Sequence, residues 1–515
     1  MGGVINIITQ QPQKTFEIAA HARMGSNSEQ LYRYSIGARR PWGFANLTTS
    51  FKAMDPYLLE DTEPQTLLFE HGGVVENPLS ETFIAGYKDY NITPRVGFDL
   101  SDKWNIEAKG GFYFKERNPG GLEGTKLRDF YYNYSGGIKA DYQISDAQHL
   151  NFSGNFDRYD KYKCYKLLNE KEKNYENSQQ RFNGLYSASF SQGHAVVAGA
   201  EFFADNLMTF MFVSDGSNAS RHAQTYAVYS QQEWRLAETF TLVTGLRYDY
   251  HSQFKGHLTP RLSAMYKPFR RISIRGGYAG GFRSPTLKEL YTDWFHPNGG
   301  GFQIIGNKDM KAEKSDNFNL STEISLGKTV ITGVAQYSLI DDMVSTVWLN
   351  SDTVLYANIG DAKVLSTELS VSSQINNDLS LRGSYAFVKD NLGKKSLVRP
   401  HSATARIDYT VPIFKAYRPI ISFSGKYLSA MDIYGTGENT DIDIETGVEQ
   451  EVPEDYKVHY EGYAIFRLTL SQALPFKLTL NAGINNLFDY QAKFTSFYSS
   501  ISPGRTYYIG LKWKL

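Results

Sequence analysis

Residues 505–515 read Arg-Thr-Tyr-Tyr-Ile-Gly-Leu-Lys-Trp-Lys-Leu, and this stretch decides the fold. Its odd positions from Tyr507 onward are aromatic or aliphatic, whereas its even positions are mostly small, polar or charged. Side chains of a β-strand alternate between two faces, so this strand has one apolar and one polar face. The same alternation recurs at 240–250, 379–388 and 477–484, which predicts repeated strands of about ten residues.

Short turns and longer connections alternate between these strands. Eleven connections, several of them long and polar, lie between ten short turns, so a chain that enters and leaves on the same side forms 22 strands. A soluble β-sandwich or propeller also alternates, but its strands are typically only about 5–6 residues long. We therefore predict an all-β fold, a 22-stranded antiparallel transmembrane β-barrel. The turns lie near 41–43, 101–103, 145–147, 192–193, 237–238, 268–270, 327–328, 376–378, 414–417 and 474–475.

The long connections are expected on the outside of the cell, because bacterial barrels have short periplasmic turns and longer outer loops. A barrel of this width normally has a plugged lumen. The expected outer loops are 53–86, 116–131, 160–178, 206–222, 281–315, 341–360, 429–460 and 488–504.

The composition excludes several classes of protein. Lys and Arg number 54 and so do Asp and Glu, a neutral balance that gives no reason to expect a nucleic-acid partner. Cys164 is the single cysteine, so the chain can form neither an internal disulfide nor a cysteine metal cluster. No apolar run approaches the roughly 18 residues of a spanning helix. G-x-S-x-G, H-E-x-x-H and P-loop motifs are absent from the sequence, and we predict that the chain is not an enzyme.

Three stretches, in order along the chain, carry a resemblance to a known family. Residues 2–9 read Gly-Gly-Val-Ile-Asn-Ile-Ile-Thr and resemble the end of the plug domain of TonB-dependent receptors. Residues 281–291 and 306–311 resemble the paired FRAP and NPDL boxes of haem receptors and their relatives. Residues 485–508 resemble the C-terminal signature of the family. The second box departs from the pattern by reading Asn-Lys-Asp-Met, and the chain ends in Leu515 where Phe is usual.

The resemblance implies two parts: 1–11 as a remnant of the plug and 12–515 as the barrel. A signal peptide, a TonB box and most of a plug are not recognised in the sequence, so we expect a fragment rather than a natural plugless barrel. In the family, coupling to TonB–ExbB–ExbD runs through the plug. This chain alone is therefore expected not to transport actively.

The function implied is TonB-dependent uptake of a bulky nutrient across the outer membrane. Haem and an iron–siderophore are the first candidates as transported ligands, with no intrinsic cofactor. A cobalamin receptor of the same family and a passive outer-membrane channel remain as alternatives. The partners implied are outer-membrane lipids and lipopolysaccharide, with a surface lipoprotein as a further candidate.

The segment 291–306 between the two boxes is the candidate ligand loop. In haem receptors with these boxes a histidine of this loop ligates haem iron, which implies that role for His296. Trp294, Phe295 and Tyr291 lie beside it in sequence and are aromatic rings that can stack on a porphyrin. An ordinary polar loop histidine is the competing interpretation. Arg283 is expected to do structural work at the strand end, with ligand contact as the alternative.

Further candidates lie in other loops. Asp441, Asp443 and Glu445 place three carboxylates on one side of an extended segment, which makes them candidate calcium ligands, with a solvated acidic loop as the alternative. Asn307 and Asp309 are expected to turn the chain through bonds to their own backbone. Loop aromatics such as 131–132 and 162 are candidates for contact with a flat ligand or, near strand ends, for the aromatic girdle of the membrane interface.

Overall fold

The computed structural model describes residues 10–515 except 71, 121–125, 191–192, 298–300, 351, 413–416, 443–448, 497 and 501, and only the backbone over 436–442 and 449–453. The prediction that 1–11 is a plug remnant falls mostly on residues outside this description and stays a prediction. Within the described part, Pro12 is fully buried and Gln11 accepts a hydrogen bond from Arg39 Nη1 at 3.1 Å.

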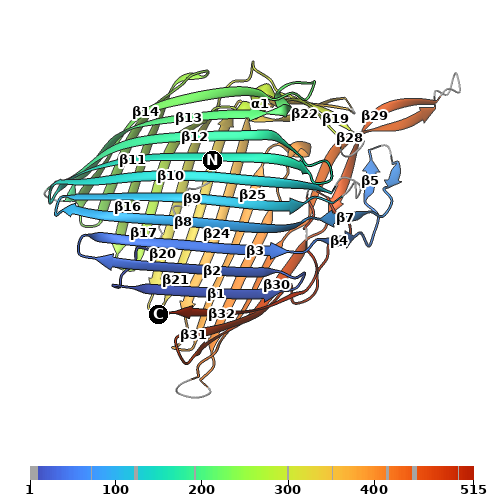
Figure 1. Ribbon diagram of the computed structural model, residues 1–515. Helices are drawn as coiled ribbons and strands as arrows, with labels where there is room; N and C mark the ends of the chain where they lie inside the picture. The colour runs from blue at the N-terminus through green and yellow to red at the C-terminus, as the bar shows by residue number, and fades with distance from the viewer. Residues whose placement is uncertain are drawn as a thin grey trace.

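The described chain forms one 22-stranded antiparallel barrel, as predicted (Figure 1). Closure comes from β1, which pairs with both β2 and β32; Ala20 lies opposite Trp513 in the second ladder. The barrel strands are β1 (Glu17–Gly25), β2 (Gln30–Arg40), β3 (Gly43–Met54), β8 (Gly86–Ser101), β9 (Trp104–Asn118), β10 (Leu127–Ser145), β11 (Gln148–Tyr165), β12 (Glu170–Ser189), β13 (Ala195–Thr209), β14 (Ala219–Ala237), β15 (Phe240–His251), β16 (Lys255–Phe269), β17 (Ile272–Arg283), β20 (Glu313–Leu326), β21 (Thr329–Asp341), β24 (Ala362–Gln374), β25 (Leu379–Asp390), β26 (His401–Thr410), β27 (Ile420–Leu428), β30 (Tyr463–Leu474), β31 (Leu478–Asn485) and β32 (Thr506–Lys514).

The two faces of the barrel wall differ as the alternation requires. On β32, Tyr507, Ile509 and Leu511 point outward and are 53%, 57% and 42% exposed, as expected of side chains that contact lipid. The lumen face is polar and its charges are paired across strands. Arg95 Nε, for example, lies 2.5 Å from Glu107 Oε1 of the neighbouring strand. Along these strands the apolar side chains therefore face outward, and the Arg95–Glu107 ion pair faces the lumen.

The predicted short turns define one end of the barrel, called here the turn end. Eight of the ten lie wholly within the described residues, and each is confirmed as the connection of two consecutive barrel strands; 192 and 413–416 of the other two lie outside the description. Leu515 N donates to Ile18 O at 2.9 Å at this end. The opposite end, at which β17 connects to β20, is called the loop end.

Two of the expected long loops are wrong. The segment 160–178 continues the barrel ladder, and β11 and β12 are joined by 166–169 alone. The segment 206–222 likewise holds the ends of β13 and β14 around the 3₁₀ turn η2 (Phe210–Phe212). In the first hairpin the ladder continues through Lys161 opposite Tyr175 and ends with Tyr165 opposite Glu170.

The loop end carries its own secondary structure (Figure 1). One four-stranded sheet runs in the order β18-β19-β23-β22, a second in the order β28-β29-β5-β6, and β4 pairs with β7. None of the helices among the described residues has the length and apolar character needed to cross a membrane. The elements are β4 (Tyr57–Glu60), β5 (Thr66–Phe69), β6 (Val74–Glu76), β7 (Glu81–Ile84), α1 (Leu287–Tyr291), β18 (Asp293–His296), β19 (Phe302–Ile305), β22 (Val344–Asn350), β23 (Thr353–Asn358), η3 (Gly393–Lys395), β28 (Met431–Ile442) and β29 (Glu449–Tyr460).

Candidate ligand site at the loop end of the barrel

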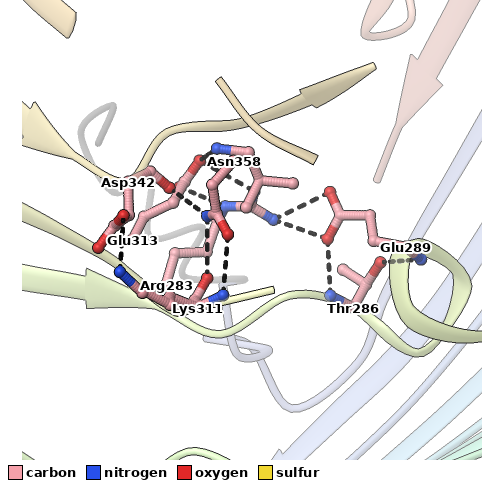
Figure 2. A network of polar contacts seen from close by, with 8 residues as sticks. Arg283, Thr286, Glu289, Lys311, Glu313, Asp342 and Asn358 are labelled. Atoms are coloured by element: carbon pink, nitrogen blue, oxygen red, sulfur yellow. Dashed lines mark hydrogen bonds and ion pairs between the residues drawn. The ribbon is translucent and has the colours of Figure 1, made fainter. Parts of the chain in front are cut away.

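Arg283 is the last residue of β17 and joins three segments of the loop end (Figure 2). Its Nε and Nη2 donate to the Glu313 carboxylate at 2.6 and 3.1 Å, and its Nη1 donates to both oxygens of Glu289 at 3.1 and 3.0 Å. Glu313 Oε1 also accepts from the Val344 backbone N–H at 2.6 Å. Planar bidentate pairs of this kind fix geometry as well as charge. The guanidinium is thus committed to holding α1, β20 and β22 together.

The short helix α1 begins at a capping box. The Thr286 hydroxyl accepts from the Glu289 N–H at 3.3 Å, and the Glu289 carboxylate accepts from the Thr286 N–H at 2.6 Å. A Thr-x-x-Glu pattern satisfies two N–H groups that a helix start leaves free. Leu287 and Leu290 are each 3% exposed and pack into two separate apolar clusters. The helix is therefore anchored to the barrel wall on one side and to the β22 connection on the other.

The two sequence boxes meet at Gly306. Its N–H donates to the Thr292 carbonyl at 2.6 Å, and the Asn307 N–H donates to the Glu289 carbonyl at 2.9 Å. A Cβ at Gly306 would lie 2.7 Å from backbone atoms of Leu290, Tyr291 and Thr292, so only glycine allows this approach. Asn307 Oδ1 accepts from the Asp309 N–H at 2.9 Å, which confirms the predicted turn.

The candidate ligand loop is a β-hairpin rather than an irregular loop. β18 pairs with β19 so that His296 lies opposite Phe302, and the two rings stack with centroids 4.9 Å apart. Trp294 meets His296 edge to face at 4.9 Å, and Trp348 of β22 lies 5.2 Å from Phe302. Phe295 points the other way and is 57% exposed. His296 thus sits in an aromatic cluster at the loop end.

Tyr291 belongs to the support of this hairpin. It packs against both apolar clusters that hold α1, and its hydroxyl oxygen accepts from Gln253 Nε2 at 2.6 Å. The guanidinium of Arg221 lies 5.0 Å from the ring centroid. Of the predicted site residues, Trp294 and His296 are brought together, whereas Tyr291 and Arg283 lie in the packing and ion pairs beneath them.

A second group of residues lines the lumen next to α1, and of its members the sequence singles out only Tyr131, as one of the loop aromatics. Tyr131, Lys161 and Tyr175 are direct cross-strand partners on β10, β11 and β12, so they share one face of the wall. Tyr159 stacks on Tyr131 at 6.1 Å and meets Tyr175 edge to face at 5.9 Å. Tyr134 and Ile138, at positions of opposite parity on β10, are exposed outward, so the group faces the lumen. We call Tyr131, Tyr159 and Tyr175 the tyrosine wall.

Lysines frame the tyrosine wall. Lys288 Nζ, from α1, lies 4.9 Å from the Tyr175 ring centroid, and Lys161 Nζ lies 5.5 Å from that of Tyr131. Burial lowers the pKa of Lys288 below its ordinary value, and the nearby positive charge of Lys161 lowers the pKa further. Asp129 lies 4.0 Å from Lys161. Two ammonium groups that repel each other beside three phenol rings form a site suited to an anion with aromatic groups.

The calcium candidates lie largely outside the described structure. Asp443 and Glu445 fall in 443–448, and only the backbone of Asp441 is described, as part of the β28–β29 ladder opposite Gln450. Across the described residues, no group of three or more His, Cys, Asp or Glu side chains is arranged to hold a metal ion. The calcium assignment therefore stays a prediction.

Comparison with known proteins identifies the family. Residues 71–487 match the family model "TonB dependent receptor-like, beta-barrel". The chain is 27% identical over 307 residues to the iron-regulated outer membrane virulence protein of Vibrio cholerae serotype O1, covering 56% of this chain and 44% of the relative. It is 23% identical to the vitamin B12 transporter BtuB of Photobacterium profundum, covering 79% and 62%. The chain thus spans less than half the length of the first of these relatives.

Solved structures share the fold over the full chain. The siderophore receptor PirA of Pseudomonas aeruginosa superposes with a TM-score of 0.73 at 15% identity, covering 100% of this chain and 83% of that one. A mutant form of the ferric enterobactin receptor PfeA of the same species gives a TM-score of 0.78 at 15% identity and covers 100% and 82%. The barrel described above is therefore a membrane barrel of the bacterial outer membrane, and the chain belongs to the TonB-dependent receptor family.

Proposed function

We propose that this barrel serves TonB-dependent uptake of a ferric siderophore whose surface is anionic and aromatic. The observation that carries the proposal is the tyrosine wall with Lys161 and Lys288 beside it at the loop end. In a barrel of this type the loop end faces the outside of the cell, where such a chelate arrives. Coupling to TonB–ExbB–ExbD through a plug is part of the proposal, as in the family.

Each part of the site supplies a different contact. The phenol rings of Tyr159 and Tyr175 offer faces and edges for planar aromatic groups, worth about 0.5–1.5 kcal/mol for each well-formed ring pair. The ammonium groups of Lys161 and Lys288 offer charge-assisted hydrogen bonds, roughly twice as strong as neutral ones. Burial is the main cause that lowers the Lys288 pKa, and an anion placed between the two lysines also relieves the second cause, the repulsion by Lys161. A trianionic ferric catecholate combines these features.

The comparisons support the same class of ligand. Relatives of this chain carry the names ferric enterobactin receptor PirA and ferric enterobactin receptor, both from Pseudomonas aeruginosa, at 22% and 21% identity. Their names describe their own ligands. The tyrosine wall suits an anionic, aromatic ligand, and these relatives are named for a ferric siderophore. Both observations favour a catecholate-type chelate over a neutral one.

Haem is the second candidate ligand, and the aromatic cluster around His296 favours it. The imidazole of His296 is stacked on Phe302 and flanked by Trp294 at the loop end of the barrel. Neutral imidazole is a good ligand for haem iron, and flat aromatic rings pack against a porphyrin. This candidate uses the hairpin β18–β19 rather than the tyrosine wall, so the two ligands can be told apart by which residues affect binding.

Ligand binding to the purified chain tests the proposal. Quenching of Tyr and Trp fluorescence is titrated with ferric tris-catecholate, with a neutral ferric trihydroxamate and with haem. We expect the catecholate complex to bind most tightly and each of Lys161→Gln and Lys288→Gln to weaken it about tenfold. Lys389→Gln on the outward face of β25 is the matched control and is expected to leave binding unchanged. Equal affinity for the anionic and neutral chelates would overturn the proposal.

A further inference from the structure

A small cavity lies at the loop end, where the β28–β29 hairpin joins β30 (Figure 1). It has a volume of about 180 Å³ and is lined by parts of 63–68, 459–463 and 490–500, together with Arg399. These segments surround β30 and β31, whereas the tyrosine wall lies on β10, β11 and β12. The cavity is therefore a second candidate site, separate from that of the proposed ferric chelate.

Arg399 supplies a cation to this cavity. Its Nη1 donates to the Ser429 carbonyl and, at 3.0 Å, to the Glu461 carbonyl, and its Nη2 reaches only the Tyr498 carbonyl, at 3.5 Å. Within the described part of the chain, Nε has no acceptor and no carboxylate lies at ion-pair distance from this guanidinium. The Nε–Nη2 edge of an arginine is a planar fork that matches a carboxylate. An anion can therefore pair with this edge.

Aromatic rings form the apolar part of the lining. The Arg399 guanidinium lies 5.3 Å from the Tyr463 ring centroid, and Tyr463 and Tyr490 stack nearly parallel with centroids 4.9 Å apart and an interplanar angle of 6°. Phe494 packs against Tyr460 at 5.4 Å, and Tyr460 is only 6% exposed. All four rings line the cavity. An aromatic ligand would thus find ring contacts directly beside the arginine.

The other charged side chains of the lining already have partners. Lys493 Nζ lies 2.9 Å from the Glu63 carboxylate and 3.0 Å from that of Glu461. His459 Nδ1 lies 2.6 Å from Asp432 Oδ1. Of the charged lining residues that the structure describes, the arginine alone lacks a partner of opposite charge. This balance favours a ligand with a single negative charge.

The volume limits the ligand to one ring. At about 30 Å³ for each water molecule, the cavity has room for roughly six waters. One aromatic ring with one carboxylate fills a space of this size, whereas a porphyrin or a chelate with three catechol rings exceeds it. The ligand of this cavity therefore differs in class from the candidates for the tyrosine wall and for His296.

We propose that this cavity binds a small aromatic carboxylate, with the carboxylate on the Nε–Nη2 edge of Arg399 and the ring against Tyr463 and Tyr490. The segments of the lining are otherwise joined by the exposed ion pairs of Lys493, which contribute little. A ligand that contacts Arg399 and Tyr490 together holds 459–463 against 490–496. Binding should therefore slow hydrogen exchange in both segments. This proposal does not depend on the ferric chelate site.

The test measures ligand binding to the purified full chain in detergent by fluorine NMR. The probes are para-fluorobenzoate and the neutral para-fluorobenzamide, and empty micelles give the background. The carboxylate is expected to bind at least tenfold more tightly than the amide. Unlabelled benzoate should displace it, whereas acetate at the same concentration should not, because acetate lacks the ring. Equal affinities for carboxylate and amide, or equal displacement by acetate, would overturn the proposal.

Two variants then locate the site. Arg399→Gln removes the fork, and Ala492→Trp fills the cavity without removing a polar contact; each is expected to weaken para-fluorobenzoate binding at least tenfold. Arg128→Gln is the matched control, because Arg128 is a partly buried arginine at the loop end of β10 that also donates to a backbone carbonyl, that of Leu127, at 2.8 Å. It is expected to bind the probe like the unmodified chain.

Three results would contradict the assignment to this cavity. The first is unchanged affinity in either Arg399→Gln or Ala492→Trp, and the second is an equal loss in Arg128→Gln. The third is unchanged hydrogen exchange at 459–463 and 490–496 when the unmodified chain is saturated with para-fluorobenzoate. Heat-dependent mobility in gel electrophoresis reports that each variant is folded.

Discussion

Arg283 and Glu313 face each other across the β17–β20 ladder at the loop end, and the guanidinium donates two hydrogen bonds to the carboxylate at 2.6 and 3.1 Å. Because Arg283 also holds Glu289, the ion pair couples the barrel wall to the N-terminus of α1. The sequence predicts structural work for Arg283 with ligand contact as the alternative, and its contacts in the structure are with Glu289 and Glu313. The loop end therefore depends on this arginine for its shape.

Removing the Arg283 charge should loosen the loop end and leave the barrel intact. Arg283→Gln is expected to lower the free energy of local opening of 287–296 by about 2 kcal/mol, because a hydrogen bond to a charged group contributes about 1.5–3 kcal/mol. Hydrogen exchange of these amides is the measurement. Lys311→Gln is the control: its ion pair with Asp342 is 3.7 Å long and the lysine is 74% exposed, so little change is expected. Equal rates of hydrogen exchange at 287–296 in the two variants would contradict the role of Arg283 in holding the loop end.

The contact at Gly306 predicts a glycine requirement. Gly306→Ala places a Cβ 2.7 Å from the backbone of α1's last turn and should destabilise the hairpin β18–β19 by about 1–3 kcal/mol. Gly333→Ala in β21 is the matched control, because a Cβ there meets nothing within 4 Å. Trp294 fluorescence and hydrogen exchange at 302–305 report the result. A Gly306→Ala protein that behaves like Gly333→Ala would show that the two boxes need not touch.

The haem candidate rests on His296. If this imidazole ligates haem iron, His296→Ala should weaken haem binding at least tenfold and shift the haem absorption maximum. His222→Ala, an exposed outward histidine on β14, serves as the control. Unchanged haem affinity in His296→Ala would remove His296 as a ligand and leave it as a member of the aromatic cluster.

The Lys288 ammonium predicts a pH dependence of anionic ligand binding. Because the Lys288 pKa in the folded protein is lower than the ordinary value of 10.5, this charge is lost at a lower pH than that of a free lysine. Affinity for ferric tris-catecholate should fall as pH rises through that lowered pKa, and Lys288→Gln should lack this fall. The stability of the unliganded protein should change in the opposite direction. Its free energy of unfolding should rise as pH increases from the lowered pKa to 10.5, because the unfolded chain binds more protons than the folded protein in this pH range. A fall of equal size in Lys288→Gln would exclude Lys288 as its cause.

The barrel was predictable from the sequence because its determinants are local. Strand alternation and turn residues act over about ten residues, which is enough to predict 22 strands and the end at which the short turns lie. The length of the β11–β12 hairpin was not predicted, because alternation shows which side chains share a face of a strand but does not show where the strand ends. Thr286 and Glu289 form a local capping box, a signal that the sequence does contain.

The tyrosine wall could not be predicted in the same way. Tyr131, Lys161 and Tyr175 come together through the register of three strands, and register is a non-local property. A period-2 reading would place Tyr131 on the polar lumen face and Tyr132 on the lipid face, and the structure divides them in this way. Lys288 joins the wall only because α1 packs onto β13, through Leu207 and Leu287.

The position of bound iron tests the central claim most directly. Crystals of the chain soaked with ferric tris-catecholate would give an anomalous iron signal at the iron absorption edge. The account predicts one peak in the lumen beside Tyr159 and Tyr175, within reach of the Lys161 and Lys288 ammonium groups. A peak beside His296 instead, or the same peak in crystals of a Lys161→Gln/Lys288→Gln variant at equal occupancy, would contradict it.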